Sequence, residues 1–231
     1  MHRFVFATFN RGKVREVDGI LSGLDIEVLS PVDLGVDALA AETGDTFLDN
    51  AVLKAAGVYQ ATGLPTFADD SGLEVASLGG APGVQSARYA GGDGHDDQAN
   101  IDKLLSSLRD VPDRRARFVC TVACLLRAAD VPNLRPELLP SSVRIVAGHP
   151  SVPAGAILVV AEGEVAGRII DVPRGVDGFG YDPVFWRDDV NKTFAELTAQ
   201  EKNGFSHRGH AFRAISQALD VILAGTVEDR R

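Results

Sequence analysis

The sequence predicts a globular protein of the mixed α/β class. Apolar residues recur at helical spacing in several stretches, and short runs rich in β-branched and aromatic residues lie between them. The chain has 231 residues, of which 45% are hydrophobic and 24% charged, a composition typical of a folded domain and not of a disordered or fibrous chain. This length allows one large domain, or two lobes that share a core.

The first part of the chain predicts a strand and two helices. A β-rich run covers residues 3–7, and residues 13–24 then place Val, Ile and Leu at helical spacing. A second helix is expected to begin at the candidate caps Asp45 and Thr46 and to stop at Gly63, which a proline follows two residues later.

The middle of the chain predicts a strand, a loop and a third helix. Residues 66–75 begin as a strand and are expected to turn at Ser71 and Gly72. A Gly-rich loop is expected over residues 79–94. Residues 97–108 carry Ile and Leu on one helical face and predict a helix.

The last part predicts further strands and a closing helix. Strands are expected at residues 118–126 and 156–161, and the second is expected to enter a strand over 165–171 through a hairpin turn at Glu162-Gly163. Residues 209–224 carry a wide apolar face and predict the last helix.

Charge and hydropathy argue against several classes of function. The 32 acidic residues outnumber the 23 basic ones, giving a net charge of -9, whereas a nucleic-acid track needs clustered Lys and Arg. No apolar run approaches the ~18 residues that span a bilayer, so we expect a cytoplasmic protein without membrane or nucleic-acid partners. Cys120 and Cys124 are expected to be buried free thiols, because no second Cys/His pair accompanies them.

A first polar cluster lies where the first strand leads into the first helix. Thr8, Asn10 and Lys13 occupy this loop, and the N–H groups and dipole of a helix amino terminus favour an anion such as phosphate. The sequence contains no G-x-x-x-x-G-K-[ST] phosphate loop. The alternative interpretation is an Asn helix cap beside a solvated lysine.

Carboxylates gather in two places. Glu42, Asp45 and Asp49 surround the expected start of the second helix, and Asp69 and Asp70 lie near the end of a strand. Adjacent strand residues point to opposite faces, so at most one of these two aspartates is expected to face a pocket with Glu42. Magnesium takes one or two carboxylates, completed by water and phosphate, and Glu42 with Asp70 could supply them. Solvent-exposed helix-start and turn acids are the alternative.

Two further clusters lie toward the end of the chain. Gly178-Phe-Gly-Tyr-Asp-Pro183 sets glycines beside two aromatic rings and an acid, where a flat base could stack, with simple packing as the alternative. Lys202 and Ser206-His-Arg208 form a local basic group, with solvated charges as the alternative. A metal pair of His207 and His210 is not expected, because no third ligand is evident.

Taken in this order, the four clusters resemble the inosine triphosphate pyrophosphatase family, whose members hydrolyse non-canonical purine nucleoside triphosphates. The T-x-N-x-x-K pattern of that family begins at Thr8, ADDSGL stands at residues 68–73 and GFGYDP at 178–183. The other matching segments are residues 42–47, 49–54, 79–83, 86–89, 196–197, 201–202 and 206–209. The exception is a Pro-rich stretch over residues 128–155, with a strand expected at 143–147, which we interpret as an insertion of unassigned role.

The resemblance implies a single domain over residues 1–231 with a long central mixed sheet and flanking helices, in two lobes around a nucleotide cleft, and a homodimer. It implies that the phosphates are held by Thr8, Asn10, Lys13 and Lys54, that Ser71 contacts the substrate, and that Mg²⁺, or Mn²⁺ in its place, is bound by Glu42 and Asp70. It also implies that the base is held and read by Phe179, Gly180, Tyr181, Asp182, Lys202, His207 and Arg208.

The expected reaction is metal-assisted attack of water on the α-phosphorus, with release of pyrophosphate. Asp70 would act as the base or orient the water, and Asp69 is the next candidate. Selectivity is expected at purine position 6, because Lys202, Arg208 and backbone N–H groups are donors that a carbonyl satisfies and an amino group does not. ITP, dITP and XTP are therefore expected to be better substrates than ATP.

Other interpretations stay open on the sequence alone. A Maf-like pyrophosphatase would act on pyrimidine or modified triphosphates, which the clusters at Phe179 and His207 disfavour. A nucleotide sensor would bind without turnover, which the presence of both Glu42 and Asp70 disfavours. A protein-interaction domain would account for the acidic surface but not for four polar clusters.

Overall fold

The computed structural model describes residues 1–91 and 96–224. The strands form one mixed sheet in the order β2-β1-β3-β4-β6-β7-β8, with β5 paired to β6. These strands are β1 (His2–Phe6), β2 (Ile26–Leu29), β3 (Thr66–Val75), β4 (Arg115–Arg127), β5 (Val143–Val146), β6 (Ala156–Ile169), β7 (Phe185–Arg187) and β8 (Lys192–Thr193). Together with the helices, this sheet confirms the predicted mixed α/β class.

The sheet mixes parallel and antiparallel pairs. β1 pairs in parallel with both β2 and β3, whereas β6 pairs antiparallel with β5 and β7. Parallel neighbours need crossover connections, which helices α1 (Arg11–Leu21) and α2 (Phe47–Thr62) provide. The other helices are α3 (Asp97–Ser107), α4 (Ala199–Phe205) and α5 (His207–Ala224).

Contacts divide the chain into two compact units. Unit 1 comprises the described residues of Met1–Asp70, Thr121–Gly163 and Gly209–Arg231, and unit 2 comprises those of Ser71–Cys120 and Glu164–Arg208. Strands β3, β4 and β6 contribute residues to both units. Each unit has a hydrophobic core of its own.

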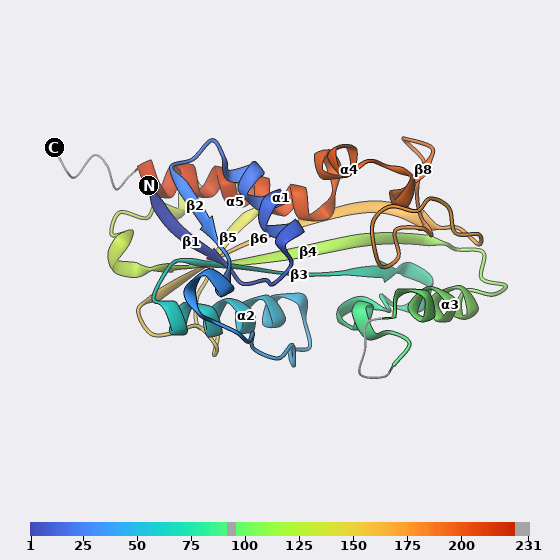
Figure 1. Cartoon of the computed structure of the whole chain (residues 1–231), viewed down its shortest axis with the longest axis horizontal. Coiled ribbons are helices and arrows are strands. Elements are labelled where there is room, and N and C mark those ends of the chain that lie inside the picture. The colour runs from blue at the N-terminus through green and yellow to red at the C-terminus, as the bar shows by residue number, and fades with distance from the viewer. Residues whose placement is uncertain (92–95, 225–231) are drawn as a thin grey trace. The chain divides into compact units, whose positions relative to one another are not determined.

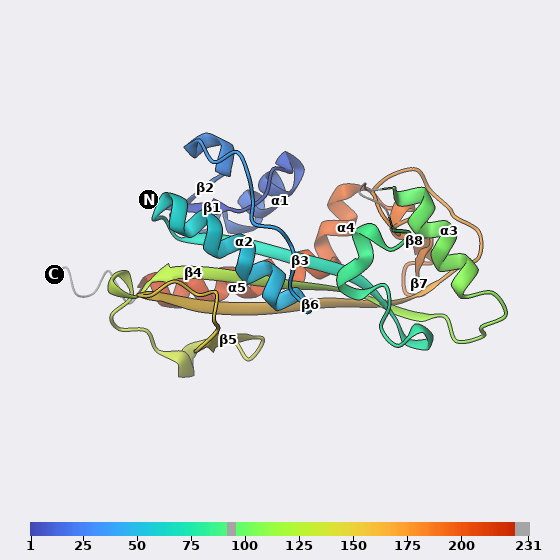
Figure 2. The same ribbon diagram turned by 90° about the horizontal axis from the view of Figure 1, so that it is seen from below.

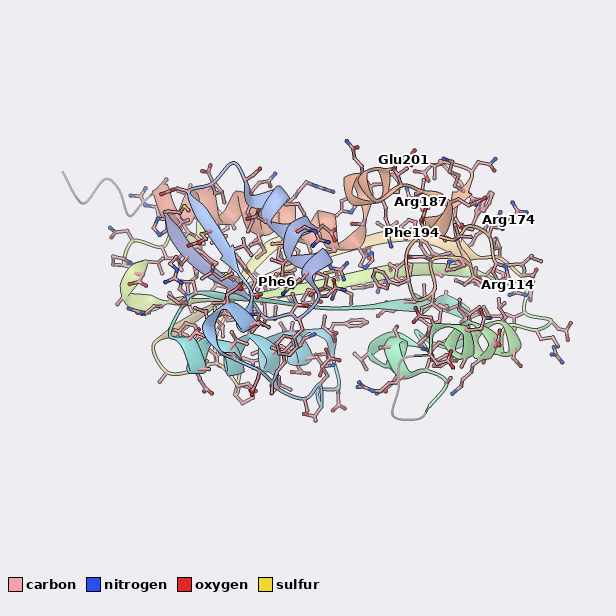
Figure 3. The ribbon with its side chains drawn as sticks, viewed as in Figure 1. Phe6, Arg114, Arg174, Arg187, Phe194 and Glu201 are labelled. Atoms are coloured by element: carbon pink, nitrogen blue, oxygen red, sulfur yellow. The ribbon has the colours of Figure 1, made fainter. Side chains whose placement is uncertain are left out.

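Unit 1 packs helices on both sides of its strands, with α2 on one side and α5 on the other (Figure 1). On the α5 side, Phe212 meets the rings of Phe6 and Phe67 edge-on, with centroids 5.3 and 6.1 Å apart. Phe6, labelled in Figure 3, is fully buried. On the α2 side, Ala51 belongs to a core cluster that includes Leu125 of β4. Strands covered on both faces need apolar residues throughout, which accounts for the Phe-Val-Phe run of β1.

Unit 2 is built around a cluster of aromatic rings. Phe118 of β4 stacks on Phe194 with centroids 5.7 Å apart and packs against Phe185 at 4.6 Å. Phe194 is labelled in Figure 3. Helices α3 and α4 lie on opposite sides of these strands (Figures 1 and 2), and α3 buries Ile101 and Leu104 in the same core.

Two predicted turns are wrong, because the strands continue through them. β3 runs through Ser71 and Gly72, and β6 runs through Glu162 and Gly163. Two-residue hairpin turns need a positive φ, and neither glycine is among the described residues that have one. Glu162 is exposed and Gly163 is buried, the alternation of a strand with one covered face.

The other expected elements are confirmed with shifted ends. The first helix begins two residues earlier than expected, at Arg11, and Thr46, not Asp45, caps the second. The last helix begins at His207. Strands β2, β7 and β8 and helix α4 were not expected. β7 and β8 have only three and two residues, and α4, with seven, completes fewer than two helical turns, so these three segments show no clear period.

The remaining expectations concern the Pro-rich stretch, the thiols and the membrane. Within residues 128–155 the expected strand is present as β5, paired antiparallel with β6. Cys120 and Cys124 are buried and form no disulfide, as predicted. No helix in the described part of the chain is long and apolar enough to cross a membrane. The end of the loop expected over 79–94 falls at residues 92–94, outside the described residues.

Candidate functional site

The first cluster forms where β1 leads into α1. Asn10 caps the helix, since its Oδ1 accepts hydrogen bonds from the N–H groups of Gly12 (2.8 Å) and Lys13 (3.2 Å). The Thr8 hydroxyl oxygen accepts from the N–H of Asn10 at 3.2 Å. The cap interpretation is therefore correct for Asn10, but Lys13 is not simply solvated. Its Nζ lies 3.2 Å from both carboxylate oxygens of Asp69.

Lys54 is the centre of the second cluster. Its buried Nζ lies 2.5 Å from Glu42 Oε1, 2.7 Å from the main-chain oxygen of Asp69 and 3.6 Å from Asp70 Oδ1. Burial lowers the pKa of this ammonium group, but the charges of Asp69, Asp70 and Glu42 outweigh burial, and the pKa is raised. Lys54 is therefore positively charged at neutral pH.

Asp70 is buried where its ionised form is disfavoured. Loss of solvation raises the pKa of this carboxyl, and the charges of Glu42 and Asp69 raise it further. Lys54 and a hydrogen bond from Asn50 oppose them, and the pKa stands at about 6. The Asp69 carboxylate faces Lys13 instead, so the two aspartates have different partners, as expected for adjacent strand residues.

The donor set around Lys54 suits a hard divalent cation. The carboxylates of Glu42, Asp69 and Asp70 outnumber the ammonium groups of Lys13 and Lys54, so the cluster keeps an excess of negative charge. Among the described residues, no group of three or more His, Cys, Asp or Glu side chains could hold an ion by itself. Mg²⁺ commonly takes one or two carboxylates and completes its shell with water and phosphate, which fits Glu42 and Asp70.

In unit 2, the turn at residues 178–182 presents an aromatic ring. Asp182 Oδ2 accepts hydrogen bonds from the N–H of Phe179 (2.9 Å) and the ammonium of Lys202 (2.5 Å). A Cβ at Gly178 would lie 2.1 Å from the same oxygen, so only glycine fits there. The turn leaves Phe179 58% exposed, with Lys202 Nζ 4.8 Å from its ring centroid. A flat ligand can therefore reach the ring of Phe179.

The other residues predicted to bind substrate in unit 2 are more enclosed. Tyr181 is 3% exposed, and its hydroxyl donates to the main-chain oxygen of Ser86 at 2.8 Å, so its ring is part of the core. His207 and Arg208, the first residues of α5, are also buried and are not solvated charges. Ser71 is half-buried within β3. Their contacts with substrate stay predictions.

Comparisons with known proteins agree on one family. The model of the Ham1 family matches residues 4–218. The chain belongs to the Ham1 family. A relative from Shigella flexneri, named dITP/XTP pyrophosphatase, is 45% identical over 221 residues, which cover 95% of this chain and 98% of that protein.

Solved Ham1 structures share the fold. A HAM1 protein from Coxiella burnetii superposes with a TM-score of 0.78 at 37% identity, covering 95% of this chain and 99% of the other. The Staphylococcus aureus Ham1 protein gives a TM-score of 0.75 at 36% identity, with 94% and 98% covered. The family resemblance and the fold class predicted from the sequence are therefore confirmed.

Sequence reasoning missed two polar side chains of this Ham1 chain, Asn50 on α2 itself and His149, which contacts α2. Asn50 is fully buried and donates to Asp70 Oδ2 at 3.1 Å, and His149 Nε2 lies 3.1 Å from Asp49 Oδ1. A signal for Asn50 existed, because it lies four residues before Lys54 and so shares its helical face. His149 gave no such signal, since it comes from the Pro-rich stretch and meets α2 only in the folded chain.

Proposed function

We propose that this Ham1 chain hydrolyses non-canonical purine nucleoside triphosphates, namely ITP, dITP and XTP, to the monophosphate and pyrophosphate. The observation that carries the proposal is the buried cluster around Lys54, where carboxylates suited to a divalent cation lie beside cations suited to phosphate. Curated relatives named dITP/XTP pyrophosphatase, 44–45% identical over 95% of the chain, support the same reaction.

Cationic groups of unit 1 would hold the triphosphate. Lys13 stands in the first turn of α1, where the helix dipole adds positive potential, and Lys54 lies on α2. Thr8 and Asn10 shape the loop before α1 through their hydrogen bonds to its backbone. These groups would neutralise the charge that grows on the leaving pyrophosphate, which requires no covalent intermediate.

Glu42 and Asp70 would hold Mg²⁺, or Mn²⁺ in its place, which when bound supplies positive charge that polarises the phosphate. Asp70 would accept a proton from water as the water oxygen bonds to the α-phosphorus and the bond to pyrophosphate breaks. In the metal-free chain the pKa of Asp70 is about 6, so this carboxylate is ionised at neutral pH and available to the cation. Asp69 is the second candidate, although its carboxylate is already paired with Lys13.

Unit 2 would bind and read the base. The exposed ring of Phe179 offers a stacking surface, and Lys202, His207 and Arg208 offer donors. A carbonyl at purine position 6 accepts hydrogen bonds from such donors. An amino group at this position is itself a donor, so the donors of the protein would have no acceptor there. Sites built on this pairing discriminate by roughly 10⁴-fold.

Product analysis tests this proposal. With ITP and Mg²⁺ we expect IMP and pyrophosphate in equal amounts, resolved by anion-exchange chromatography. IDP and phosphate would place the attack at the γ-phosphorus and contradict the proposal. A preference for dTTP would favour a Maf-like activity, and ITP binding without hydrolysis would favour a sensor.

The family resemblance also supports an assembly and a location. We propose that two copies of the chain form a homodimer in the cytoplasm. Light scattering of the purified chain at micromolar concentration tests the dimer, and a mass equal to one chain would contradict it.

A further inference from the structure

Asn50 has no role in the reaction described above, yet its side chain is fully buried beside the carboxylate cluster. It lies in the first turn of α2, a helix that runs beside β3 in Figures 1 and 2. Its Oδ1 accepts a hydrogen bond from the N–H of Gly44 at 2.8 Å, and its Nδ2 donates to Asp70 Oδ2 at 3.1 Å. One amide therefore bridges two segments of the chain.

The two bridged segments carry the two carboxylates suited to a cation. Gly44 stands two residues after Glu42, and Asp70 is itself on β3. The segment of Gly44 also packs tightly on α2, because a Cβ at Gly44 would lie 2.4 Å from Asp49 Cβ and 3.0 Å from Asn50 Oδ1. Asn50 thus ties the segment of Glu42 and the strand of Asp70 to one point on α2.

We propose that Asn50 is a positioning residue that fixes the carboxylates of Glu42 and Asp70 relative to each other, so that both bind one divalent cation. This inference rests on the proposed function, since the cation is the one that the reaction would use. Asn50 acts on the cation only through Glu42 and Asp70 and would not touch the substrate.

The chemistry of the amide supports this role. An amide offers an acceptor to the Gly44 N–H and a donor to a carboxylate at the same time. An aspartate at position 50 would set a second negative charge against Asp70, and an aliphatic side chain would leave both partners of Asn50 without its hydrogen bonds. Because Oδ2 of Asp70 is held by Asn50, its Oδ1 is the oxygen nearer to Lys54, and Lys54 in turn contacts Glu42.

Direct binding of Mn²⁺ to the full-length chain, without nucleotide, tests the proposal. Free Mn²⁺ is followed by electron paramagnetic resonance, so the readout does not depend on turnover. Asn50→Leu keeps the γ-branched shape of the side chain, with bulkier methyl groups in place of the amide oxygen and nitrogen, and removes both hydrogen bonds. We expect its Mn²⁺ dissociation constant to rise about 10- to 100-fold, as is typical when a group that orients metal ligands is lost.

Asn100→Leu is the matched control. Asn100 of α3 is also buried, and its amide also accepts from one N–H, of Ala90 at 2.7 Å, and donates to one carbonyl, of Ala87 at 3.1 Å. Its loss should lower the stability of the chain by a similar amount and leave the Mn²⁺ dissociation constant within twofold of wild type. A change common to both variants would show a general effect on folding and overturn the proposal.

Gly44→Ala is a second test that leaves Asn50 in place. It can be measured even if the Asn50→Leu variant does not fold. The added methyl group must displace the segment of Glu42 from α2, so Mn²⁺ should again bind at least 10-fold more weakly. Folded variants that bind Mn²⁺ as tightly as wild type would overturn the proposal. The proposal would also be overturned if the wild-type protein bound Mn²⁺ no more tightly than the Glu42→Gln variant does. An intact Mn²⁺ site in a chain that hydrolyses no ITP would contradict only the proposed function.

Discussion

The carboxyl group of Asp70 lies close to the charges of Glu42 and Asp69 and to the ammonium group of Lys54. Its pKa of about 6 lies roughly two units above that of an ordinary aspartate, mainly because the carboxyl is buried. Each unit corresponds to about 1.4 kcal/mol, so an ionised Asp70 destabilises the folded, metal-free chain by roughly 2–3 kcal/mol. A bound cation would offset this penalty.

The stability of the metal-free chain should therefore depend on pH through Asp70. As the pH falls through 6 toward 4, the folded chain takes up this proton before the unfolded chain does, so the penalty disappears. In EDTA, Asp70→Asn should raise the free energy of unfolding by roughly 2–3 kcal/mol at pH 7.5 and by only ~0.5 kcal/mol near pH 4. Urea denaturation at both pH values measures this, with Asp102→Asn on the exposed side of α3 as control. An equal effect at both pH values would contradict the assignment.

The same substitution should nearly abolish catalysis. Asp70→Asn loses the proposed base and one carboxylate for the cation, so kcat for ITP should fall by about 10²- to 10³-fold. The protein should remain folded by circular dichroism. Turnover above a tenth of the wild-type rate would remove Asp70 from the role of base, and a larger loss in Asp69→Asn would transfer that role to Asp69.

Residue types and local spacing were enough to identify most of the polar side chains in these clusters. Local spacing indicated Lys13, Glu42 and Asp70, the family resemblance added Lys54, and these side chains do lie within one unit. The partners of these residues could not be predicted, because Lys13 and Asp69 are 56 positions apart in sequence and meet only in the folded chain. Burial of Asp70, which sets its pKa, likewise depends on packing.

At the scale of elements, the turn that carries Phe179 is fixed by close backbone contacts. Gly175 has a φ of +82°, and a Cβ there would lie 2.2 Å from the carbonyl of Ala195. The N–H of Gly180 donates to Asp97 Oδ2 at 2.7 Å, which ties the turn to α3. Contacts at Gly175, just before the turn, and at Gly180, within it, therefore fix the turn. The ring of Phe179 is exposed between these two positions.

Gly175→Ala tests this packing, and Gly80→Ala is its control. Both glycines have a left-handed φ, +82° and +90°, but nothing lies within 4 Å of a Cβ at Gly80. Gly80→Ala should cost about 1 kcal/mol of stability from backbone strain alone. Gly175→Ala should cost about 1–3 kcal/mol more, because the Ala195 backbone cannot move aside, and should raise KM for ITP. Equal losses in thermal unfolding would show that the close contact has no effect.

Helices with clear periodicity were predictable, whereas the continuity of strands was not. Glycine and polar residues inside β3 and β6 look locally like turns, but both segments continue as strands, and each lies next to the long strand β4 in the sheet. Strands β7 and β8 and helix α4 are too short to carry a period, and they form where unit 2 supplies partners such as Phe118 for Phe185.

At the scale of the whole molecule, an acidic chain must bind a polyanion. The net charge of -9 repels a triphosphate at long range, so we expect binding to depend on local lysines and on the proposed cation, which would add positive charge. The lysines proposed for phosphate and the carboxylates proposed for the cation belong to unit 1, and the side chains proposed to read the base belong to unit 2. Rate and selectivity should therefore respond to different substitutions.

Selectivity for the base should respond to Lys202. Lys202→Met removes a donor proposed for purine position 6, so the ratio of kcat/KM for ITP over ATP should fall at least about 10-fold. Lys103→Met is the control, because Lys103 also lies over an aromatic ring, that of Tyr89 at 4.6 Å, but outside the turn of Phe179. An unchanged ratio in Lys202→Met would remove Lys202 from base recognition.

The proposed metal-dependent hydrolysis of non-canonical purine triphosphates is tested most directly by measuring pyrophosphate release. ITP, XTP, dTTP and ATP are each assayed with Mg²⁺ and with EDTA. We expect release from ITP and XTP only with the metal, and roughly 10⁴-fold slower release from ATP. Comparable turnover of ATP and ITP, or undiminished release in EDTA, would contradict it.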